Sequence, residues 1–209
     1  MKNKNKINYK LYLVSDRYML NGKDLIQSLE EAILGGVTML QLRDKDNSTL
    51  DFYKEAIKVK QLTRKYNIPY IINDRLDIAM AVDADGAHLG QDDMPLSVAR
   101  KLLGPDKIIG ISVQNIDEAL KAQEGGADYI GVGAIFDTST KKDAHSVKIT
   151  TLDGIKKAVN IPVVAIGGIN YLNAMEVIGM GIEGIAVISA ILGEKNIKDA
   201  SEKLMSLYK

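Results

Sequence analysis

The sequence contains no cysteine and only two histidines, His88 and His145. A chain without cysteine cannot form a disulfide scaffold, a thiolate zinc site or a cysteine nucleophile. Two histidines are also too few for a histidine-rich metal site. The lack of cysteine fits the reducing cytoplasm, where we expect this chain to reside.

Excess charge and long apolar runs are missing as well. The 27 basic and 27 acidic side chains cancel, which argues against a protein that binds nucleic acid or a membrane surface. No segment approaches the ~20 unbroken apolar residues of a membrane span. Residues 1–10 are rich in Lys and Asn and lack the apolar stretch of a secretory signal. We predict a flexible tail over residues 1–8 and one catalytic domain over residues 9–209.

Short apolar segments alternate with amphipathic ones along the chain. With 209 residues, of which 46% are hydrophobic, the chain can bury one sizeable core. The short segments are rich in Ile and Val and apolar throughout, which is typical of parallel strands covered on both faces. The eight predicted strands are Tyr9–Ser15, Met39–Leu42, Tyr70–Ile72, Gly86–Leu89, Ile108–Ser112, Tyr129–Val132, Val163–Ile166 and Ile185–Ile188.

The segments between these strands have helical spacing. Leu50, Tyr53 and Ile57 lie at i, i+3 and i+7. Asn115 is followed three residues later by Glu118, the pattern of a capping box at a helix start. A last helix is predicted near Asp199–Leu207.

Eight strand–helix units in this length favour a single-domain (β/α)8 TIM barrel. A doubly wound open sheet is the alternative, because strand order cannot be read from one sequence. The stretch Gly179–Gly184 matches the glycine pattern of a dinucleotide site, which needs a strand before it and a helix after it. Here the order is reversed, so the pattern indicates a helix end and a tight turn.

Polar residues follow seven of the predicted strands. Barrel enzymes carry their chemistry at the C-terminal ends of the strands, so we expect these residues to meet on one rim. They are Gln41–Lys45, Asn73–Arg75, Gly90–Asp93, Ser112 with Gln114, Asp137–Lys142, Gly167-Gly168 and Ser189.

The charges on this rim suit a diphosphate held through a metal ion. Arg43, Lys45 and Lys141 are more cations than one phosphate monoester needs. Asp74 and Asp93 would repel the same anion unless a divalent cation lies between, and Mg2+ is commonly held by one or two carboxylates with phosphate oxygens. A helix N-cap at Asp74 and an ordinary turn acid at Asp93 are the structural alternatives.

A second anion site is expected nearby. Gly167-Gly168 and Ser189 follow the last two strands, the common phosphate-binding place of these barrels, although a tight turn alone would also explain the glycines. The hydroxyls of Thr138–Thr140 suit a second anion too, whereas His88, inside a strand, is more often a satisfied core histidine than a base. Two anions on one rim suggest group transfer with diphosphate as the leaving group, and the pattern does not name the substrates.

An ordered set of motifs from about Tyr9 to Leu192 resembles the thiamine-phosphate synthase family. The motifs lie in order and with the spacing of that family. They are Gln41–Lys45, Ile72–Asp74, Gly86–Asp93, Gly110–Ser112, Gly126–Gly133, Thr138–Asp143, Ile166–Ile169 and Val187–Ala190.

The resemblance implies a (β/α)8 barrel that joins a hydroxymethyl-aminopyrimidine diphosphate to a hydroxyethyl-thiazole phosphate with Mg2+. It implies catalytic roles for Lys141, Arg43, Lys45 and Ser112. The pyrimidine diphosphate would contact Gln41, Leu42, Arg43, Asp44, Lys45, Asn73, Ser112 and Lys141. Asp74 and Asp93 would hold the Mg2+. The thiazole phosphate would contact Thr138, Ser139, Thr140, Gly168, Ile188 and Ser189.

Two other functions stay open beside this one. A thiazole tautomerase of the same superfamily would bind thiazole phosphate without needing diphosphate. A barrel that kept the pockets but lost turnover would act as a ligand-binding regulatory protein. The combination of Asp74, Asp93 and Lys141 favours the synthase, with two phosphorylated small molecules as partners, no nucleic acid and no membrane, and an open oligomeric state.

Overall fold

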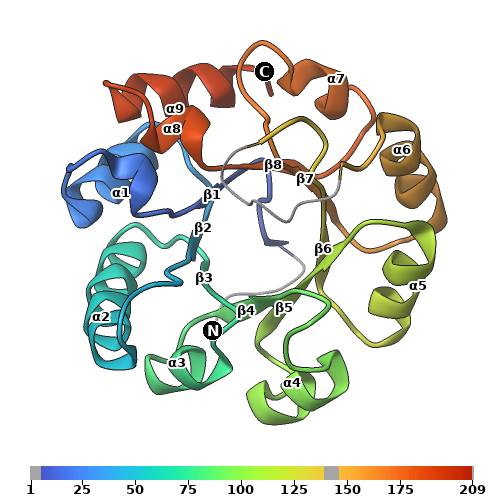
Figure 1. Cartoon of the computed structure of the whole chain (residues 1–209), viewed down its shortest axis with the longest axis horizontal. Helices are drawn as coiled ribbons and strands as arrows, with labels where there is room; N and C mark the ends of the chain where they lie inside the picture. The colour runs from blue at the N-terminus through green and yellow to red at the C-terminus, as the bar shows by residue number, and fades with distance from the viewer. Residues whose placement is uncertain (1–5, 139–145, 209) are drawn as a thin grey trace.

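The computed structural model describes residues 6–138 and 146–208. Their strands form a closed barrel in which each strand pairs in parallel with its neighbours in chain order, as seen at the centre of Figure 1. The strands are β1 (Leu11–Val14), β2 (Met39–Leu42), β3 (Tyr70–Asn73), β4 (Gly86–Leu89), β5 (Ile108–Val113), β6 (Tyr129–Val132), β7 (Val163–Ile166) and β8 (Gly184–Val187).

Helices surround this barrel on the outside (Figure 1). A 3-10 helix, η2 (Tyr18–Leu20), follows β1. The α-helices are α1 (Leu25–Leu34), α2 (Thr49–Lys65), α3 (Leu76–Ala81), α4 (Leu96–Leu103), α5 (Ile116–Glu124), α6 (Ile149–Ala158), α7 (Ala174–Ile178), α8 (Ser189–Leu192) and α9 (Ile197–Ser206).

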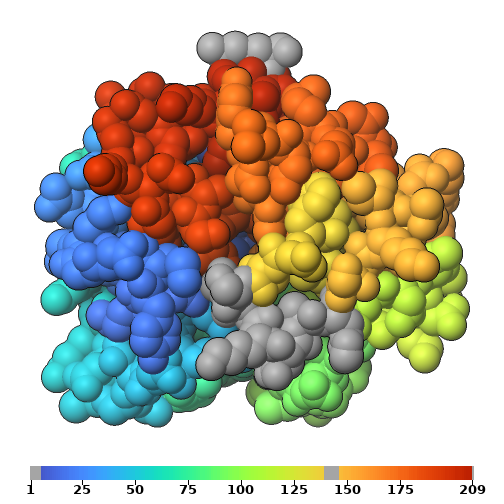
Figure 2. Space-filling view, turned by 45° about the horizontal axis from the view of Figure 1, so that its top comes forward, coloured from blue at the N-terminus to red at the C-terminus, as the bar shows by residue number. Residues whose placement is uncertain are grey.

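Closure of the sheet confirms the predicted single (β/α)8 barrel. Strand β8 pairs with β1 through the register Leu11↔Ile185, Tyr12↔Ala186 and Leu13↔Val187. The open doubly wound alternative is therefore wrong, because its first and last strands would not pair. Helix α9 also packs against α1, and Figure 2 shows the C-terminal residues in red beside the N-terminal ones in blue.

Two hydrophobic cores explain why the strands have no polar alternation. Leu11 and Leu13 of β1 point outward into the core shared with the helices. Tyr12 and Val14 of the same strand point inward into a second core that fills the barrel. Successive side chains of a strand point to opposite faces, so a strand buried on both faces is apolar at every position.

Four predicted strands have the observed bounds, and the others differ by one or two residues at an end. Strand β1 begins at Leu11, not Tyr9, and β8 begins at Gly184, one residue before its apolar run. A Cβ on Gly184 would lie 1.7 Å from the backbone oxygen of Tyr9. Closure of the barrel brings the start of β8 against the chain that leads into β1. The first residue of β8 therefore has to be a glycine, and the apolar run that predicted the strand begins one residue later.

Helix α2 shows what the helical spacing did and did not predict. The helix forms over Leu50, Tyr53 and Ile57, but its fully buried face is formed by Phe52, Ala56 and Val59, and Leu50 remains exposed. The predicted cap of α5 is confirmed, since Asn115 Oδ1 accepts the backbone N–H of Glu118 at 2.9 Å.

The glycine pattern Gly179–Gly184 connects a helix to a strand, as expected. Gly179 ends α7, Gly181 adopts a φ of 74° and β8 begins at Gly184. This order is the reverse of a dinucleotide-binding motif. Among the described helices, none is long and apolar enough to cross a membrane.

Side chains at the starts of the even-numbered strands tie the N-terminal end of the barrel together. Each of these residues directly precedes its strand and accepts a backbone N–H from the first or second residue of the strand before it. Asp128 Oδ2, ahead of β6, accepts from Ile109 at 2.7 Å, and Glu183 Oε2, ahead of β8, accepts from Val163 at 2.8 Å. Asp85 and Thr38 make the corresponding bonds to Tyr70 and Leu11.

Candidate active site

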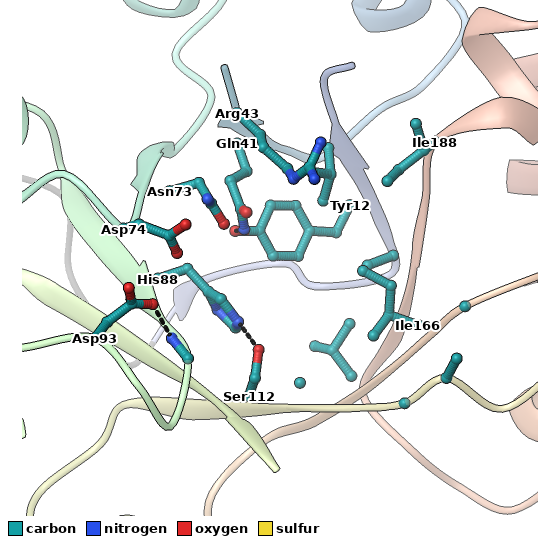
Figure 3. Close-up of a pocket in the computed structure, with 18 of the residues that line it drawn as sticks. Tyr12, Gln41, Arg43, Asn73, Asp74, His88, Asp93, Ser112, Ile166 and Ile188 are labelled. Carbon is teal, nitrogen blue, oxygen red and sulfur yellow. Dashed lines mark hydrogen bonds between the residues drawn. The ribbon is translucent and has the colours of Figure 1, made fainter. Parts of the chain in front are cut away.

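A cavity of about 630 Å³ lies at the C-terminal ends of the strands. Figure 3 shows it with Asp74 and Asp93 on one side and Ile166 and Ile188 on the other. Its lining residues are Tyr12, Val14, Gln41, Arg43, Lys45, Asn73, Asp74, His88, Gly90, Gln91, Asp92, Asp93, Ser112, Gln114, Glu118, Tyr129, Gly131, Gly133, Ala134, Thr138, Val164, Ile166, Gly167, Ala186 and Ile188.

The charged side of the cavity comes from the ends of β2, β3 and β4. Arg43 follows β2 and is held by the end of β1. Asp16 Oδ2 accepts from its guanidinium at 2.7 Å, and Ser15 Oγ accepts its backbone N–H at 2.9 Å. Asp16 is buried, so this ion pair holds Arg43 in place with little competition from water.

Asp74 occupies an unusual backbone position next to a second carboxylate. Its φ is 59°, in the left-handed region that Asp tolerates better than most residues. Burial, followed by the neighbouring Asp93, raises the pKa of Asp74 to about 6, while Lys45 and Asn73 act in the opposite direction. Lys45 Nζ lies 3.6 Å from Asp74 Oδ2, and the Lys45 side chain is half exposed.

The structural alternatives for the two aspartates have different outcomes. Helix α3 begins at Leu76 with Arg75 at its N-cap, so Asp74 is not the cap of that helix. Asp93 does close a turn, because its Oδ2 accepts the backbone N–H of Gly90 at 2.6 Å. It also lines the cavity, so the turn and a ligand-binding role are compatible at Asp93.

The donor set of Asp74 and Asp93 is suited to a hard divalent cation. Mg2+ is usually bound by one or two carboxylates, with waters and phosphate oxygens completing its coordination. Within residues 6–138 and 146–208 no cluster of three or more His, Cys, Asp or Glu could hold a metal by protein ligands alone. An all-protein cage is therefore not formed by these residues, whereas a two-carboxylate site is available.

The opposite side of the cavity is apolar. It is built from β1, β7 and β8 and the residue after β8, by Val14, Val164, Ile166, Ala186 and Ile188. Such a wall favours the face of a flat, weakly polar ring over an anion.

A row of hydrogen-bonded side chains forms the floor of the cavity. His88 is buried on β4, and its two ring nitrogens lie 2.9 Å from the Tyr129 hydroxyl and 2.9 Å from Ser112 Oγ. The Tyr12 hydroxyl lies 2.9 Å from that of Tyr129 and accepts from Gln41 Nε2 at 2.6 Å. His88 is thus a hydrogen-bonded interior histidine, as expected, and it also lines the cavity.

The glycine pair after β7 meets the needs of a tight turn. Gly167 and Gly168 have φ values of 101° and 63°. A Cβ on Gly167 would lie 2.5 Å from Ala134 Cα, and one on Gly168 would lie 2.4 Å from the backbone oxygen of Asp137. The turn alone therefore requires both glycines, and Gly167 also lines the cavity.

The structure brings most of the predicted site residues together. Those that line the cavity are Gln41, Arg43, Lys45, Asn73, Asp74, Asp93, Ser112, Thr138 and Ile188. Ser139, Thr140 and Lys141 lie outside the described residues.

Four predicted residues are not among those that line the cavity. Leu42 points into the outer core, because it neighbours the inward-facing Gln41 on the same strand. The Asp44 carboxylate accepts hydrogen bonds from its own loop and from Arg17. Gly168 and Ser189 directly follow lining residues, and Ser189 is exposed.

Sequence reasoning missed the support around these residues. Ser15 and Asp16 follow β1 directly, so the position that identified the other strand ends would have found them. Tyr12 and Tyr129 lie within strands that are apolar on both faces. The sequence therefore does not indicate whether each tyrosine points into the barrel or toward the helices.

Fold and cavity together define this chain as a member of the class of (β/α)8-barrel enzymes. A family model described as thiamine monophosphate synthase matches residues 11–191. The chain belongs to the thiamine monophosphate synthase family, whose members are transferases.

Several known proteins are similar over nearly the whole chain. A thiamine-phosphate synthase of Clostridium acetobutylicum is 57% identical over 203 residues, covering 97% of this chain and 96% of that protein. One of Alkaliphilus oremlandii is 54% identical over 209 residues, covering 100% of both. The solved thiamine phosphate pyrophosphorylase of Pyrococcus furiosus superposes with a TM-score of 0.89 at 44% identity, covering 96% of each chain.

Proposed function

We propose that this chain is a Mg2+-dependent thiamine-phosphate synthase. It would join a hydroxymethyl-aminopyrimidine diphosphate to a hydroxyethyl-thiazole phosphate, giving thiamine phosphate and diphosphate. One observation carries the proposal: two adjacent carboxylates and two cations face an apolar wall across one cavity. The names of the relatives support the same reaction.

Asp74 and Asp93 would hold the Mg2+. Burial and the neighbouring Asp93 make ionisation of Asp74 less favourable, as its raised pKa indicates, and a divalent cation between the two carboxylates would offset both effects. When bound, the ion supplies positive charge that stabilises the departing diphosphate.

The chain's own cations and donors would hold the diphosphate. Arg43, oriented by Asp16, presents a planar guanidinium suited to paired phosphate oxygens. Lys45 adds a flexible second charge, and the Ser112 hydroxyl adds a neutral donor. Lys141, outside the described residues, keeps its predicted role beside the same group.

The two rings would lie on the apolar side and the floor of the cavity. Gln41 and Asn73 offer amide groups to a heteroaromatic edge, and Ile188 contributes to a hydrophobic face. Thr138 and the turn at Gly168 would receive the phosphate of the thiazole, with Ser139, Thr140 and Ser189 as the further predicted contacts.

The reaction needs positioning and charge stabilisation more than a nucleophile. The bond between the methylene carbon and the diphosphate oxygen breaks, and its electron pair leaves with the diphosphate. The amino-substituted pyrimidine stabilises the resulting cation, and the lone pair of the thiazole nitrogen then forms the new carbon–nitrogen bond. The protein has to hold the partners in line and exclude water, which suits a chain without cysteine.

Released diphosphate, measured with both substrates and Mg2+, tests this function. Asp93→Ala is expected to lower Mg2+-dependent turnover by ~10²-fold or more with the fold intact, because a rim carboxylate adds little to the core. Asp106→Ala, an exposed aspartate ahead of β5 that is not among the lining residues, is the control. Normal Mg2+-dependent activity of Asp93→Ala would remove the metal assignment. A parent protein that releases no diphosphate would instead point to the tautomerase or the regulatory protein.

A further inference from the structure

The hydrogen-bonded row on the cavity floor crosses the barrel from β2 to β5. It begins at an amide, passes through two phenols and an imidazole, and ends at a hydroxyl. Its members in order are Gln41, Tyr12, Tyr129, His88 and Ser112, joined by contacts of 2.6, 2.9, 2.9 and 2.9 Å. Ser112 is the partly exposed end, and the other four are buried.

The direction of this row follows from its first member. The amide nitrogen of Gln41, Nε2, can donate a hydrogen bond but cannot accept one. It therefore donates, and the Tyr12 oxygen accepts. The single hydrogen of Tyr12 then goes to the Tyr129 oxygen, and the single hydrogen of Tyr129 goes to His88 Nδ1. Each hydroxyl accepts one bond and donates one, so the first donor sets the direction of all the others.

Both phenols keep the hydrogen that this arrangement needs. Burial holds the pKa values of Tyr12 and Tyr129 well above the ordinary value for tyrosine. The packing also holds the rings in place, since a Cβ on Gly110 would lie 2.1 Å from Tyr129 Cζ. A Cβ on Gly131 would lie 3.1 Å from His88 Cε1, so this glycine makes room for the imidazole.

The direction of the row determines which nitrogen of the His88 ring carries the hydrogen, and thereby the role of Ser112 in the cavity. Because Nδ1 of His88 accepts, the neutral ring carries its hydrogen on Nε2 and donates it to Ser112 Oγ. Ser112 therefore acts as the acceptor in that bond, and its own hydrogen is available to a ligand in the cavity that it lines. In the part of the chain that the structure describes, no bond donated by that hydroxyl is seen.

We propose that this row is a one-way relay in which Tyr129 and His88 are positioning residues that make Ser112 a hydrogen-bond donor to bound diphosphate. The role of the ligand in this statement rests on the proposed function. If the row ran in the reverse direction, Ser112 would donate its hydrogen to His88. That hydrogen would then be unavailable for a bond to the diphosphate.

The tautomer of His88 tests the relay without any ligand. The protein has only two histidines, so ring nitrogen shifts of the 15N-histidine-labelled full chain are readily assigned with His88→Gln. The relay predicts an unprotonated Nδ1 and a protonated Nε2 on His88. A protonated Nδ1 with a bare Nε2 would overturn it.

Removing one hydroxyl should disturb the tautomer in a specific way. Tyr129→Phe keeps the ring packed on Gly110 but deletes the donor to His88, so the shifts should move toward a mixture of both tautomers. Tyr70→Phe deletes another buried hydroxyl, which donates to the Ala56 carbonyl in the outer core, and should leave His88 unchanged. Unchanged shifts in Tyr129→Phe would contradict the relay.

Binding of inorganic diphosphate with Mg2+, measured by calorimetry, tests whether the relay acts through Ser112. Tyr129→Phe should weaken binding about 3- to 10-fold, the range of one hydrogen bond. In a Ser112→Ala background the same change should have no further effect. Equal losses in both backgrounds would refute action through Ser112. If the parent does not bind diphosphate, the proposed function fails, and the tautomer still decides whether the relay exists.

Discussion

At the scale of single residues, the surroundings of Asp74 decide its chemistry. An aspartate after a strand is ordinarily a turn or cap residue, and this one is partly buried beside another carboxylate. Its ionised form is therefore less favourable in the folded protein than in the unfolded chain. This unfavourable ionisation makes the stability of the protein depend on pH, and under the proposed function it would also make stability depend on Mg2+.

The stability of the metal-free protein should reflect this carboxylate. The pKa of Asp74 is raised from 3.8 to about 6, so its contribution to the free energy of unfolding is present below pH 3.8 and is lost as pH rises through 6. Asp74→Asn should remove that loss, on the order of 1–2 kcal/mol between pH 4 and pH 7.

Urea unfolding of parent and variant at both pH values measures this difference. Asp106→Asn, an exposed aspartate that does not line the cavity, should follow the parent. Added Mg2+ should stabilise the parent more at pH 7 than at pH 4. A parent and an Asp74→Asn variant with the same dependence on pH would show that Asp74 is not the responsible group.

At the scale of elements, the two ends of each strand have different duties. The C-terminal ends present the charged and polar groups of the cavity. The N-terminal ends carry side chains that accept strand amides, as Asp128 does for Ile109 while also pairing with Arg100 at 2.5 Å. Function and support are thus separated between the two ends of the barrel, as is usual for this fold.

Asp128→Ala should therefore lower the free energy of unfolding by about 2–3 kcal/mol without weakening diphosphate binding. The change leaves a buried strand N–H and the largely buried Arg100 without this partner. Glu124→Ala, exposed at the end of α5, should change stability by less than ~0.5 kcal/mol. Chemical denaturation measures both variants, and weaker diphosphate binding by Asp128→Ala would refute the separation of duties.

At the scale of the whole molecule, closure of the barrel depends on one close approach. Strand β8 meets the chain entering β1 at Gly184, where a side chain would collide with the backbone of Tyr9. Backbone cannot rotate away as a side chain can, so closure tolerates only glycine there.

Gly184→Ala should cost at least about 3 kcal/mol of unfolding free energy, or prevent folding, because β1 and β8 would be forced apart. Gly154→Ala is the control, since its Cβ would meet only the flexible end of Ile116 at 3.2 Å and α6 would gain a better helix former. Thermal unfolding compares the two variants. A Gly184→Ala protein as stable as Gly154→Ala would show that closure does not need this contact.

Local patterns predicted much of this molecule. Short apolar runs identified all eight strands, because burial on both faces leaves a signal within a few residues. The position of Asp74, Asp93 and Ser112 at or soon after the ends of those runs placed them in one cavity, because parallel strands of a barrel all end on the same side. The strands, and the position of polar residues relative to their ends, depend only on the order of residues along the chain, which the sequence gives directly.

Contacts between distant residues could not be predicted in the same way. Tyr12 and Tyr129 are 117 positions apart, and only a closed barrel brings their hydroxyls to 2.9 Å. The pairing of Asp16 with Arg43, and that of Asp44 with Arg17, depend on how neighbouring strands align. Composition and spacing thus establish which strands and helices form and which reactive side chains are present. The direction of each side chain, its hydrogen-bond partners and its protonation are decided by the tertiary structure, because they depend on distances in space.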